Sequence, residues 1–427
     1  MKLEHNGIRG TTLKLLKDYL NGREQYIHFN GVDSKNLQME FGVPQGSVLG
    51  PLLFLIYIND LVNSSDEGKF VLFADDTNIF VSGKSEEDVY IKAQNVLNDV
   101  QNYMIVNQLH INMTKSVFMH FRPYLNENDR KTCARARIDK SLKISNIKIK
   151  RVTEVKFLGV IIDDELSWEP EINYLKGKLI SSIVIIKRIK HFIPTSEYLK
   201  LYDSLFKSHL IYCISSWGGI SRNKLDNLFV IQKRCIRLLF GKIPNFDQSE
   251  FYETCARVRP YQQHVAKKNY ILEHTKPIFN EMGLLSLHHL HVYHTFLDMF
   301  KILKFKSPIT LYELFTLTFR STGLLAILPE TSYNIVKCNF IFKASSIWNS
   351  LIEKVMNKCE PLMNQNNPAL NGIIIPGSVV GSDLAASFLK IKQKLKNVLL
   401  DVEKLDTPGQ LGWVKSDEWL TENFFTH

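Results

Sequence analysis

Two adjacent carboxylates, Asp75 and Asp76, are the residues of this chain whose types and spacing are best suited to chemistry. Short apolar, β-prone runs flank the pair within Phe70–Val81, and this pattern predicts a buried β-hairpin with the aspartates at or beside its turn. Like charges this close repel, and burying them unpaired is costly. Mg²⁺ would remove the conflict, since it favours one or two carboxylates together with phosphate oxygens. An exposed Asp-Asp turn is the alternative interpretation.

A glycine-containing loop lies a short distance upstream of these carboxylates. Residues 42–50 read Gly-Val-Pro-Gln-Gly-Ser-Val-Leu-Gly. Glycines let the backbone approach a ligand closely, and helix N-termini attract phosphate groups. Ser47 is expected to cap a buried apolar helix that carries Pro51 in its first turns and runs to Leu61. An ordinary loop before a core helix would show the same pattern.

Together, the two motifs resemble those of reverse transcriptases from non-LTR retrotransposons, in particular those of jockey-like arthropod elements. The resemblance rests on Gly42-Val-Pro-Gln-Gly-Ser-Val-Leu-Gly-Pro-Leu-Leu-Phe54 and on Phe73-Ala-Asp-Asp76. The first motif is specific in length and order, and the second is specific through its distance from the first. The resemblance implies RNA-templated DNA synthesis with two Mg²⁺ ions, an RNA template, a DNA primer and deoxynucleoside triphosphates.

The same resemblance implies roles for individual residues. Asp75 and Asp76 match the catalytic metal ligands, and Lys115 matches a lysine near the triphosphate that could donate a proton to pyrophosphate. A surface lysine on a strand edge is the alternative for Lys115. The remaining matches are the residues that position template and nucleotide, Pro44, Gln45, Gly46 and Ser47, and the primer-grip residues, Leu158 and Gly159.

The segment Met1–Gly10 resembles the one that directly follows the first catalytic motif of these enzymes, a Phe-Asp followed closely by a histidine. That motif contributes a shared metal-binding aspartate in relatives. We therefore expect the sequence as given to show negligible primer extension. A second hypothesis is a catalytically inactive retroelement remnant that only binds nucleic acid.

Length and charge suggest how the rest of the chain is organised. The 427 residues predict two or three domains, and 53 Lys and Arg against 43 Asp and Glu give a net charge of +10, which fits a polyanionic partner. We expect an α+β polymerase palm over residues 1–165, an antiparallel sheet with packed helices. Its further elements are expected to be a helix at Thr11–Asn21, strands at Tyr26–Asn30 and Leu37–Phe41, a helix at Ser85–Val106, a basic irregular insertion at 122–150 and a strand at Val155–Ile162.

A helical thumb is expected over residues 166–265, where basic residues are about twice as numerous as acidic ones. Its candidate helices are Glu171–His191, Thr195–Cys213 and Arg222–Phe240. Lys233, Arg234 and Arg237 lie on successive turns of the last helix and are expected to contact the nucleic-acid backbone. A solvated basic face that touches nothing is the alternative.

Residues 266–427 are expected to form a helical C-terminal region, with helices at Phe340–Leu351 and Phe388–Leu405. Four histidines cluster there, and without a nearby Cys, Asp or Glu they are expected to be exposed or stacking rather than zinc ligands: His288, His289, His291 and His294. The six cysteines lie far apart, which predicts free thiols. No secretory signal or membrane-spanning run is found, and the resemblance implies the nucleus or cytoplasm. The oligomeric state stays open.

Overall fold

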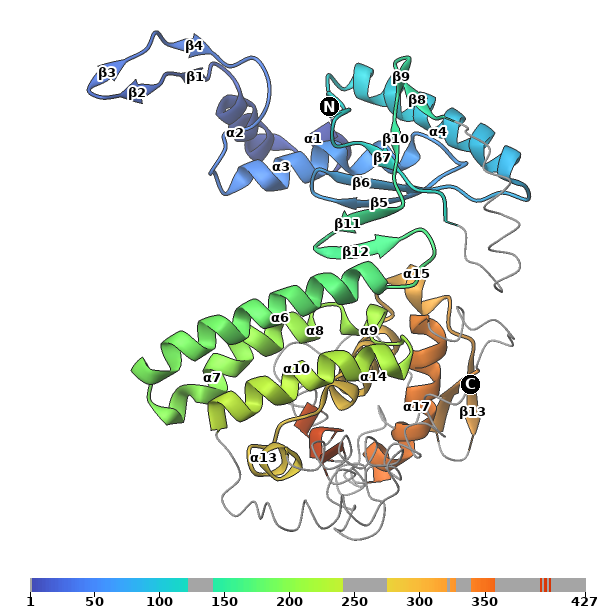
Figure 1. The fold of residues 1–427 in the computed structure, drawn as a ribbon. Helices are drawn as coiled ribbons and strands as arrows, with labels where there is room; N and C mark the ends of the chain where they lie inside the picture. The colour runs from blue at the N-terminus through green and yellow to red at the C-terminus, as the bar shows by residue number, and fades with distance from the viewer. Residues whose placement is uncertain are drawn as a thin grey trace, which may run out of the picture. The chain divides into compact units, whose positions relative to one another are not determined.

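The computed structural model describes residues 2–121, 141–240, 275–320, 323–327, 339–357 and seven residues between 392 and 400. The chain divides into two compact units (Figure 1), the first made of Met1–His120 with Arg135–Val152 and the second of Phe121–Ala134 with Thr153–His427. The described residues form a mixed α and β structure, mostly helical with small two-stranded sheets. The mixed class agrees with the expectation, whereas the palm and thumb stay predictions.

The first unit is centred on an antiparallel hairpin of β5 (Lys69–Phe73) and β6 (Asp76–Phe80). Successive side chains of a strand point to opposite faces. One face of this hairpin packs against helix α4 (Glu86–Val106), while the other leaves Val71, Phe73 and Phe80 46%, 60% and 48% exposed. The predicted hairpin is therefore confirmed, but its expected burial is wrong, because no described element of this unit covers the second face.

Helix α4 begins where its sequence predicts. The Ser85 hydroxyl accepts a hydrogen bond of 3.1 Å from the backbone N–H of Asp88, and acidic residues fill the first turn. Val96 and Val100 are buried against the β5–β6 hairpin in a small apolar cluster. The expected packing of this helix on the sheet that carries Asp75 is confirmed.

Helix α3 (Leu49–Ile58) continues as the 3₁₀ helix η1 (Asn59–Asn63) and connects the glycine-containing loop to the hairpin. Leu53 and Leu61 are buried, but Leu52 is 53% exposed. Only one side of this apolar helix therefore has a partner among the described residues of its unit. The expected burial of the whole helix is wrong for the other side.

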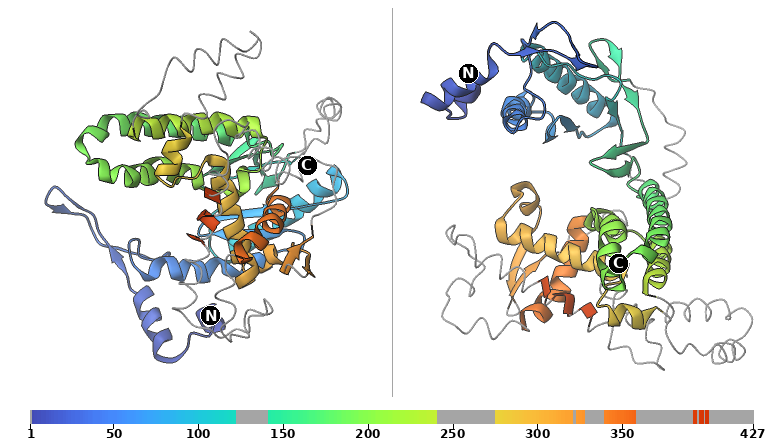
Figure 2. Two further views of the ribbon diagram at one scale, coloured as in Figure 1. Left: turned by 90° about the horizontal axis from the view of Figure 1, so that it is seen from below. Right: turned by 90° about the vertical axis from the view of Figure 1, so that its left-hand side faces the viewer.

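The N-terminal part contains helices α1 (Lys2–His5) and α2 (Gly10–Leu20), followed by an extended arm. The burial of Leu13 and Leu16 confirms the predicted amphipathic helix. In the arm, β1 (Glu24–Gln25) pairs with β4 (Leu37–Gln38), and β2 (His28–Phe29) pairs with β3 (Val32–Asp33). The two strands expected at 26–30 and 37–41 do not pair with each other, because a tight turn at Asn30-Gly31 folds the first segment back on residues 32–33. Figures 1 and 2 show this arm extending away from α2.

Four short strands complete the first unit. Strand β7 (Val117–Phe118) pairs in parallel with β10 (Lys150–Arg151), and β8 (Lys143–Ile144) pairs with β9 (Ile147–Lys148). Ile144 and Ile149 pack with Tyr90 of α4 in a second small cluster. The expectation of an irregular insertion is wrong for 143–150, where these strands form, and residues 122–140 lie outside the described residues.

The second unit starts with a hairpin of β11 (Glu154–Phe157) and β12 (Val160–Asp163). The expected single strand over 155–162 is wrong, because Leu158 and Gly159 turn the chain with φ angles of 45° and 90°. Asp163 then accepts hydrogen bonds of 2.9 Å from the backbone N–H groups of Ser167 and Trp168. These bonds satisfy amides at the start of helix α6 (Glu169–Ile189), so Asp163 holds the turn between β12 and this helix.

Helices make up most of the remaining described residues of the second unit, and α6 and α10 (Arg222–Phe240) lie side by side (Figures 1 and 2). The expected helix at 195–213 is interrupted by a π-helical segment at Asp203–Lys207, and the expected helix at 388–405 lies largely outside the described residues. The other elements are η2 (Lys190–Phe192), η3 (Thr195–Glu197), α7 (Tyr198–Tyr202), α8 (Ser208–Ile211), α9 (Ile214–Trp217), α13 (Lys276–Glu281), α14 (Leu287–Phe305), α15 (Ile309–Tyr312), β13 (Leu317–Arg320), β14 (Gly323–Ala326) and α17 (Phe340–Asn357).

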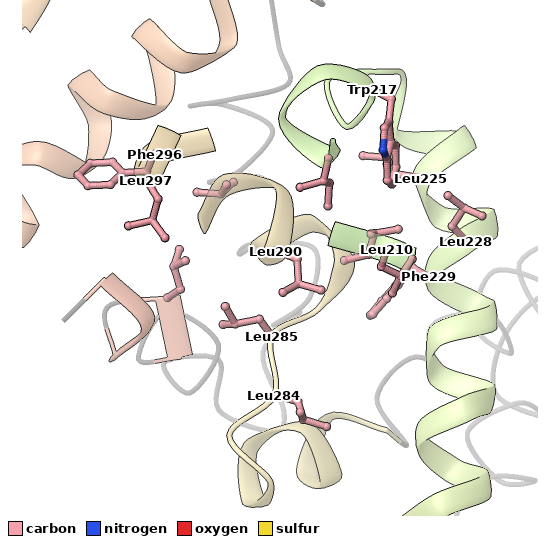
Figure 3. Close-up of a cluster of buried hydrophobic side chains, with 14 of the residues drawn as sticks. Leu210, Trp217, Leu225, Leu228, Phe229, Leu284, Leu285, Leu290, Phe296 and Leu297 are labelled. Atoms are coloured by element: carbon pink, nitrogen blue, oxygen red, sulfur yellow. The ribbon is translucent and has the colours of Figure 1, made fainter. Parts of the chain in front are cut away.

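One large apolar core holds these elements together. Figure 3 shows side chains of this core, among them Leu210 of α8, Trp217 of α9 and Phe229 of α10. Trp348 of α17 stacks on Phe296 of α14 with ring centroids 5.0 Å apart, which joins the predicted helix at Phe340 to the same core. The described C-terminal elements are therefore part of the second unit's core.

Candidate active site

The tight turn of the β5–β6 hairpin presents the two aspartates. Phe73 pairs with Asp76 across the hairpin, so Ala74 and Asp75 are the two turn residues, and Ala74 has a φ angle of 52°. Both carboxylates are exposed. Neither Asp75 nor Asp76 forms a side-chain hydrogen bond or ion pair with any described residue. Two adjacent negative charges therefore lie at a turn with no protein cation against them in the part of the chain that is described.

The glycine-containing loop is closed onto the start of α3. The carbonyl of Pro44 accepts hydrogen bonds from the backbone N–H and the hydroxyl of Ser47, at 3.4 and 2.8 Å, and Gly46 supplies the positive φ of 80° that this turn needs. The Ser47 hydroxyl also accepts from the N–H of Gly50 at 3.0 Å. Although α3 begins at Leu49, Ser47 therefore performs the predicted capping role.

Two further residues shape this loop and were missed in the sequence. A Cβ on Gly50 would lie 2.9 Å from the Pro44 carbonyl oxygen, so only glycine fits this close approach without a shift. Arg23 Nη2 donates to the carbonyl of Gly42 at 2.6 Å, and its Nε donates to that of Leu20 at 3.2 Å. Arg23 thus ties the loop to the end of α2. A basic residue after a helix C-terminus was the only available signal for it.

Helix α3 and η1 place the loop and the aspartate hairpin in one unit. Ile58 and Leu61 are buried in the same cluster as Leu72 of β5 and Ile79 of β6. A polar contact reinforces this region, because Lys2 Nζ donates to the Asp60 carboxylate at 2.8 Å. Burial raises the pKa of Asp60, but hydrogen bonds from Lys2 and Tyr103 outweigh it and leave the pKa below its ordinary value.

Lys115 lies in a turn of the same unit. The Asn112 side-chain oxygen accepts hydrogen bonds from the N–H groups of Thr114 and Lys115, at 3.1 and 3.3 Å, which is an Asx-type turn. The Lys115 side chain is exposed, and the strand itself starts at Val117. The surface-lysine alternative is therefore right about exposure, while the role of Lys115 toward a triphosphate stays a prediction.

Leu158 and Gly159 form the turn of the β11–β12 hairpin in the second unit. The Tyr212 hydroxyl donates a hydrogen bond to the Leu158 carbonyl. A Cβ on Gly159 would lie 3.3 Å from the Tyr212 ring, so the glycine lets the turn pack against tyrosine. Tyr212 was missed because it lies far from the hairpin in sequence.

Residues 3–162 match the family profile described as reverse transcriptase (RNA-dependent DNA polymerase). These residues are similar to the reverse transcriptase family. The match contains the glycine-containing loop, the Asp75-Asp76 turn and Lys115, and it extends into the β11–β12 hairpin.

The relatives that match this chain are proteins of mobile elements. A probable RNA-directed DNA polymerase from transposon X-element of Drosophila melanogaster is 25% identical over 236 residues, and the RNA-directed DNA polymerase from mobile element jockey of Drosophila funebris is 26% identical over 238. Each alignment covers 53% of this chain and 25% of the relative. A Pol polyprotein from the type-1 retrotransposable element R1 of Bradysia coprophila is 23% identical, covering 56% of this chain and 23% of the relative. The chain thus spans about a quarter of the length of the curated relatives it matches.

Beyond the matched reverse transcriptase domain, the basic residues of α10 do not share one exposed face. Lys233 is only 1% exposed, and its Nζ lies 4.5 Å from the centroid of the Phe229 ring. Its expected contact with a nucleic-acid backbone is therefore wrong, because the helix turns this residue toward the core. Arg234 is exposed and Arg237 is half-buried, and both stay candidates.

The histidines beyond the reverse transcriptase domain are also buried. His288, His289 and His291 are 5%, 3% and 1% exposed, so of the two expected arrangements, exposed or stacking, the exposed one is wrong for these three and the stacking one holds for His288. His288 packs edge-to-face on Phe229 and lies 3.3 Å from the Asp226 carboxylate. Among the described residues, no group of three or more His, Cys, Asp or Glu side chains is arranged to hold a metal ion.

Two broader expectations outside the reverse transcriptase site can also be compared with the structure. Cys213 and Cys235 are free thiols, as predicted, and the other four cysteines lie outside the described residues. None of the described helices combines the length and apolar character needed to cross a bilayer.

Proposed function

We propose that this chain contributes the reverse transcriptase domain of a non-LTR retrotransposon polymerase, which copies an RNA template into DNA from a primer. The observation that carries this proposal is the exposed Asp75-Asp76 turn within the matched domain, without a neutralising partner among the described residues. Its location by family would be the nucleus or cytoplasm.

Magnesium fits the donor set at this turn. Carboxylate oxygens are the ligands that Mg²⁺ prefers, and Mg²⁺ completes its shell with water and substrate phosphates. When bound, two Mg²⁺ ions would activate the primer 3′-hydroxyl and stabilise charge on the leaving pyrophosphate. Asp75 and Asp76 would hold the ions, and their exposed position leaves room for nucleic acid and nucleotide.

The remaining candidate residues would bind and orient the substrates. Pro44, Gln45, Gly46 and Ser47 would position template and nucleotide, since the loop presents a backbone fixed by its own hydrogen bonds. Lys115 would hold or give up a proton at the pyrophosphate. Contacts to the primer and its backbone would come from Leu158, Gly159, Arg234 and Arg237.

Metal binding and primer extension test the proposal in parallel. Asp75→Asn removes one charge at the turn and should weaken Mn²⁺ binding at least tenfold and lower any extension by about 10²- to 10³-fold. Asp66→Asn is the matched control, because Asp66 is also exposed and also lacks a side-chain partner among the described residues. Mn²⁺ binding is measured as the decrease of the electron paramagnetic resonance signal of free Mn²⁺, and it should be unchanged in this control. Asp75→Asn protein that extends a primer at the parental rate would overturn the proposal.

Nucleic-acid binding without synthesis is the second candidate function. It is favoured because the described residues supply only two neighbouring carboxylates at this turn and no larger ligand group. This candidate predicts that the 427-residue chain binds an RNA–DNA duplex but extends no primer with Mg²⁺ or Mn²⁺. Measurable extension that Asp75→Asn removes would exclude it.

A further inference from the structure

Two lysines and a tyrosine from different elements meet on the surface of the second unit. Lys156 lies on β11, whereas Tyr174 and Lys178 lie one helical turn apart on α6. Lys156 Nζ donates to the Tyr174 hydroxyl oxygen at 3.2 Å. The two ammonium groups lie 5.2 and 4.8 Å from the centroid of the Tyr174 ring. Two lysines that are 22 residues apart in sequence thus contact the same tyrosine ring.

Buried contacts beneath this surface hold β11–β12 and α6 in a fixed arrangement. Glu171 of α6 is 5% exposed, and its Oε2 accepts a hydrogen bond of 2.7 Å from the backbone N–H of Ile161 in β12. Ile172 and Leu175 of the same helix turn are buried in the core. The three surface residues are therefore presented by two elements that are joined below them, and they do not depend on a loose loop.

The charges at this position are not neutralised by an ion pair. Neither lysine lies within ion-pair distance of a carboxylate in the described part of the chain. The buried Glu171, which accepts the Ile161 amide, attracts both lysines only from a longer distance. Hydrogen bonds from Lys178 and Lys156 lower the pKa of Tyr174, which reflects the positive potential around the phenol. Because Lys156 donates to the phenol oxygen, the phenol O–H can itself donate to a third group.

We propose that Lys156, Tyr174 and Lys178 form a binding site for a backbone phosphate of a nucleic-acid strand. Two ammonium groups and one phenol O–H converge on it, and the non-bridging oxygens of a phosphodiester are acceptors for all three. The inference deepens the proposed function by naming a substrate contact in the second unit. It rests on that function only in taking the strand to be the polymerase's template or primer.

A long polyanion fits this surface better than a single nucleotide. Helix α6 also exposes Arg188, which forms no ion pair with a described residue and lies on the same side of the helix as Tyr174 at 3.6 residues per turn. Positive charge therefore continues along the helix beyond the three-residue site. A nucleotide triphosphate would reach only one part of this surface, whereas a strand repeats its phosphates along it.

Salt dependence of binding measures the contact directly. Lys156→Gln with Lys178→Gln should weaken binding of a labelled 20-base-pair RNA–DNA duplex roughly tenfold or more at about 0.1 M salt and flatten the log–log salt slope by about two units. Lys200→Gln with Lys224→Gln is the matched control. It removes the same charge from the same unit, but the structure pairs these lysines with Glu197 and Glu169. Equal loss in both double variants, or no loss in the first, would overturn the proposal.

A charge-neutral change separates a built site from a general positive field. Tyr174→Phe keeps the ring under both ammonium groups but removes the O–H donor, so duplex affinity should fall about threefold to tenfold with an unchanged salt slope. Unchanged affinity would show that the phenol O–H makes no contact with the phosphate and would contradict a site that includes Tyr174. Displacement of the duplex by millimolar deoxynucleoside triphosphate, lost in the Lys156 and Lys178 double variant, would assign the site to nucleotide instead.

Failure of this inference can be told apart from failure of the proposed polymerase function. Asp75→Asn protein should retain the parental affinity and salt slope for the duplex, because its charge change lies at the metal turn in the other unit. If the lysine double variant binds normally while Asp75→Asn loses metal binding and extension, only the phosphate site is excluded. A parent chain that does not bind the duplex even at low salt would also exclude the phosphate site.

Discussion

The two units differ in how their apolar residues are used. The second unit has one continuous core, and it contains nearly all of the largest fully buried side chains of the described residues, including Trp217, Trp348 and Phe206. Among its described residues, the first unit has only two small clusters, while Phe29 and Val48 are 72% and 93% exposed. The unit that carries the Asp75-Asp76 turn therefore has the smaller apolar core of the two.

In the second unit apolar side chains stabilise the fold, whereas in the first unit some of them lie exposed beside the candidate metal site. The face of the β5–β6 hairpin that carries Asp76 also exposes Val71 and Phe73, and β-strand alternation places them on the side opposite α4. A contiguous apolar surface of this kind marks an interaction site more often than a free surface. We therefore expect a partner that binds this face to stabilise the first unit.

The largest effect should come from removing a core side chain of the second unit. Trp217 is fully buried and its indole N–H donates to the Tyr212 carbonyl at 2.9 Å. Trp217→Ala should lower the free energy of unfolding of this unit by about 3–5 kcal/mol. Phe73→Ala, at a position 60% exposed, should change the stability of the first unit by less than about 1 kcal/mol. Hydrogen exchange of peptides from each unit measures both, and similar losses would contradict the contrast.

Acid should destabilise the second unit selectively. Burial lowers the pKa of His291 to about 3 and that of His294 to about 4. In the unfolded chain both would titrate near 6.5, so below that pH the unfolded state takes up protons that the folded state refuses. Stability is therefore complete above about pH 6.5 and should fall with decreasing pH by up to about 1.4 kcal/mol per pH unit for each histidine, until its folded pKa is reached.

Tryptophan fluorescence follows this acid effect in one unit only. All five tryptophans lie at residues 168–419, within the second unit, so urea titrations read by their emission report on that unit. His291→Leu should reduce the slope of the free energy of unfolding against pH by about the contribution of one proton. A free energy of unfolding that is constant between pH 6.5 and 4 would contradict the prediction.

Local signals in the sequence predicted elements well and burial poorly. The apolar runs that flank Asp75 and Asp76 and the Ser85 cap are properties of neighbouring residues, and the structure has the hairpin and α4 where these patterns place them. Whether a face is covered depends on which distant segments pack on it. That is why the hairpin was expected to be buried and Lys233 exposed, and both expectations were wrong.

Turns inside apolar runs and contacts across long sequence separations were the other limits. Val155–Ile162 is apolar through most of its length, and the Leu158-Gly159 turn within it is marked only by one glycine. The contacts of Arg23 with Gly42 and of Tyr212 with Leu158 join residues 19 and 54 positions apart. No periodic pattern in the sequence encodes such pairs. The glycine-containing loop could therefore be predicted, but the contacts that Arg23 and Tyr212 make could not.

A smaller effect is expected from the helix cap that positions α4 behind the aspartate hairpin. Ser85→Ala removes the hydroxyl that accepts from the Asp88 amide and should lower the stability of the first unit by about 1 kcal/mol. Ser64→Ala is the control, because the Ser64 hydroxyl is buried without a hydrogen-bond partner among the described residues, and its loss should cost little or nothing. Faster hydrogen exchange in residues 86–92 of the Ser85 variant alone is the expected readout. Equal effects would mean that the cap adds nothing to the unit.

The smallest effect concerns the two faces of α10 and sharpens the contrast between packing and binding. Arg234 is exposed, so Arg234→Ala should leave stability within about 0.5 kcal/mol of the parent and flatten the salt slope for duplex binding by up to about one unit. Its neighbour Lys233 is 1% exposed against the Phe229 ring, and Lys233→Ala should lower the stability of the second unit without changing that slope. Filter binding between about 50 and 300 mM salt, combined with urea titration, separates the two outcomes. A changed slope in the Lys233 variant would mean that this side chain reaches the nucleic acid after a rearrangement of α10, and the division between a packing face and a binding face would then fail.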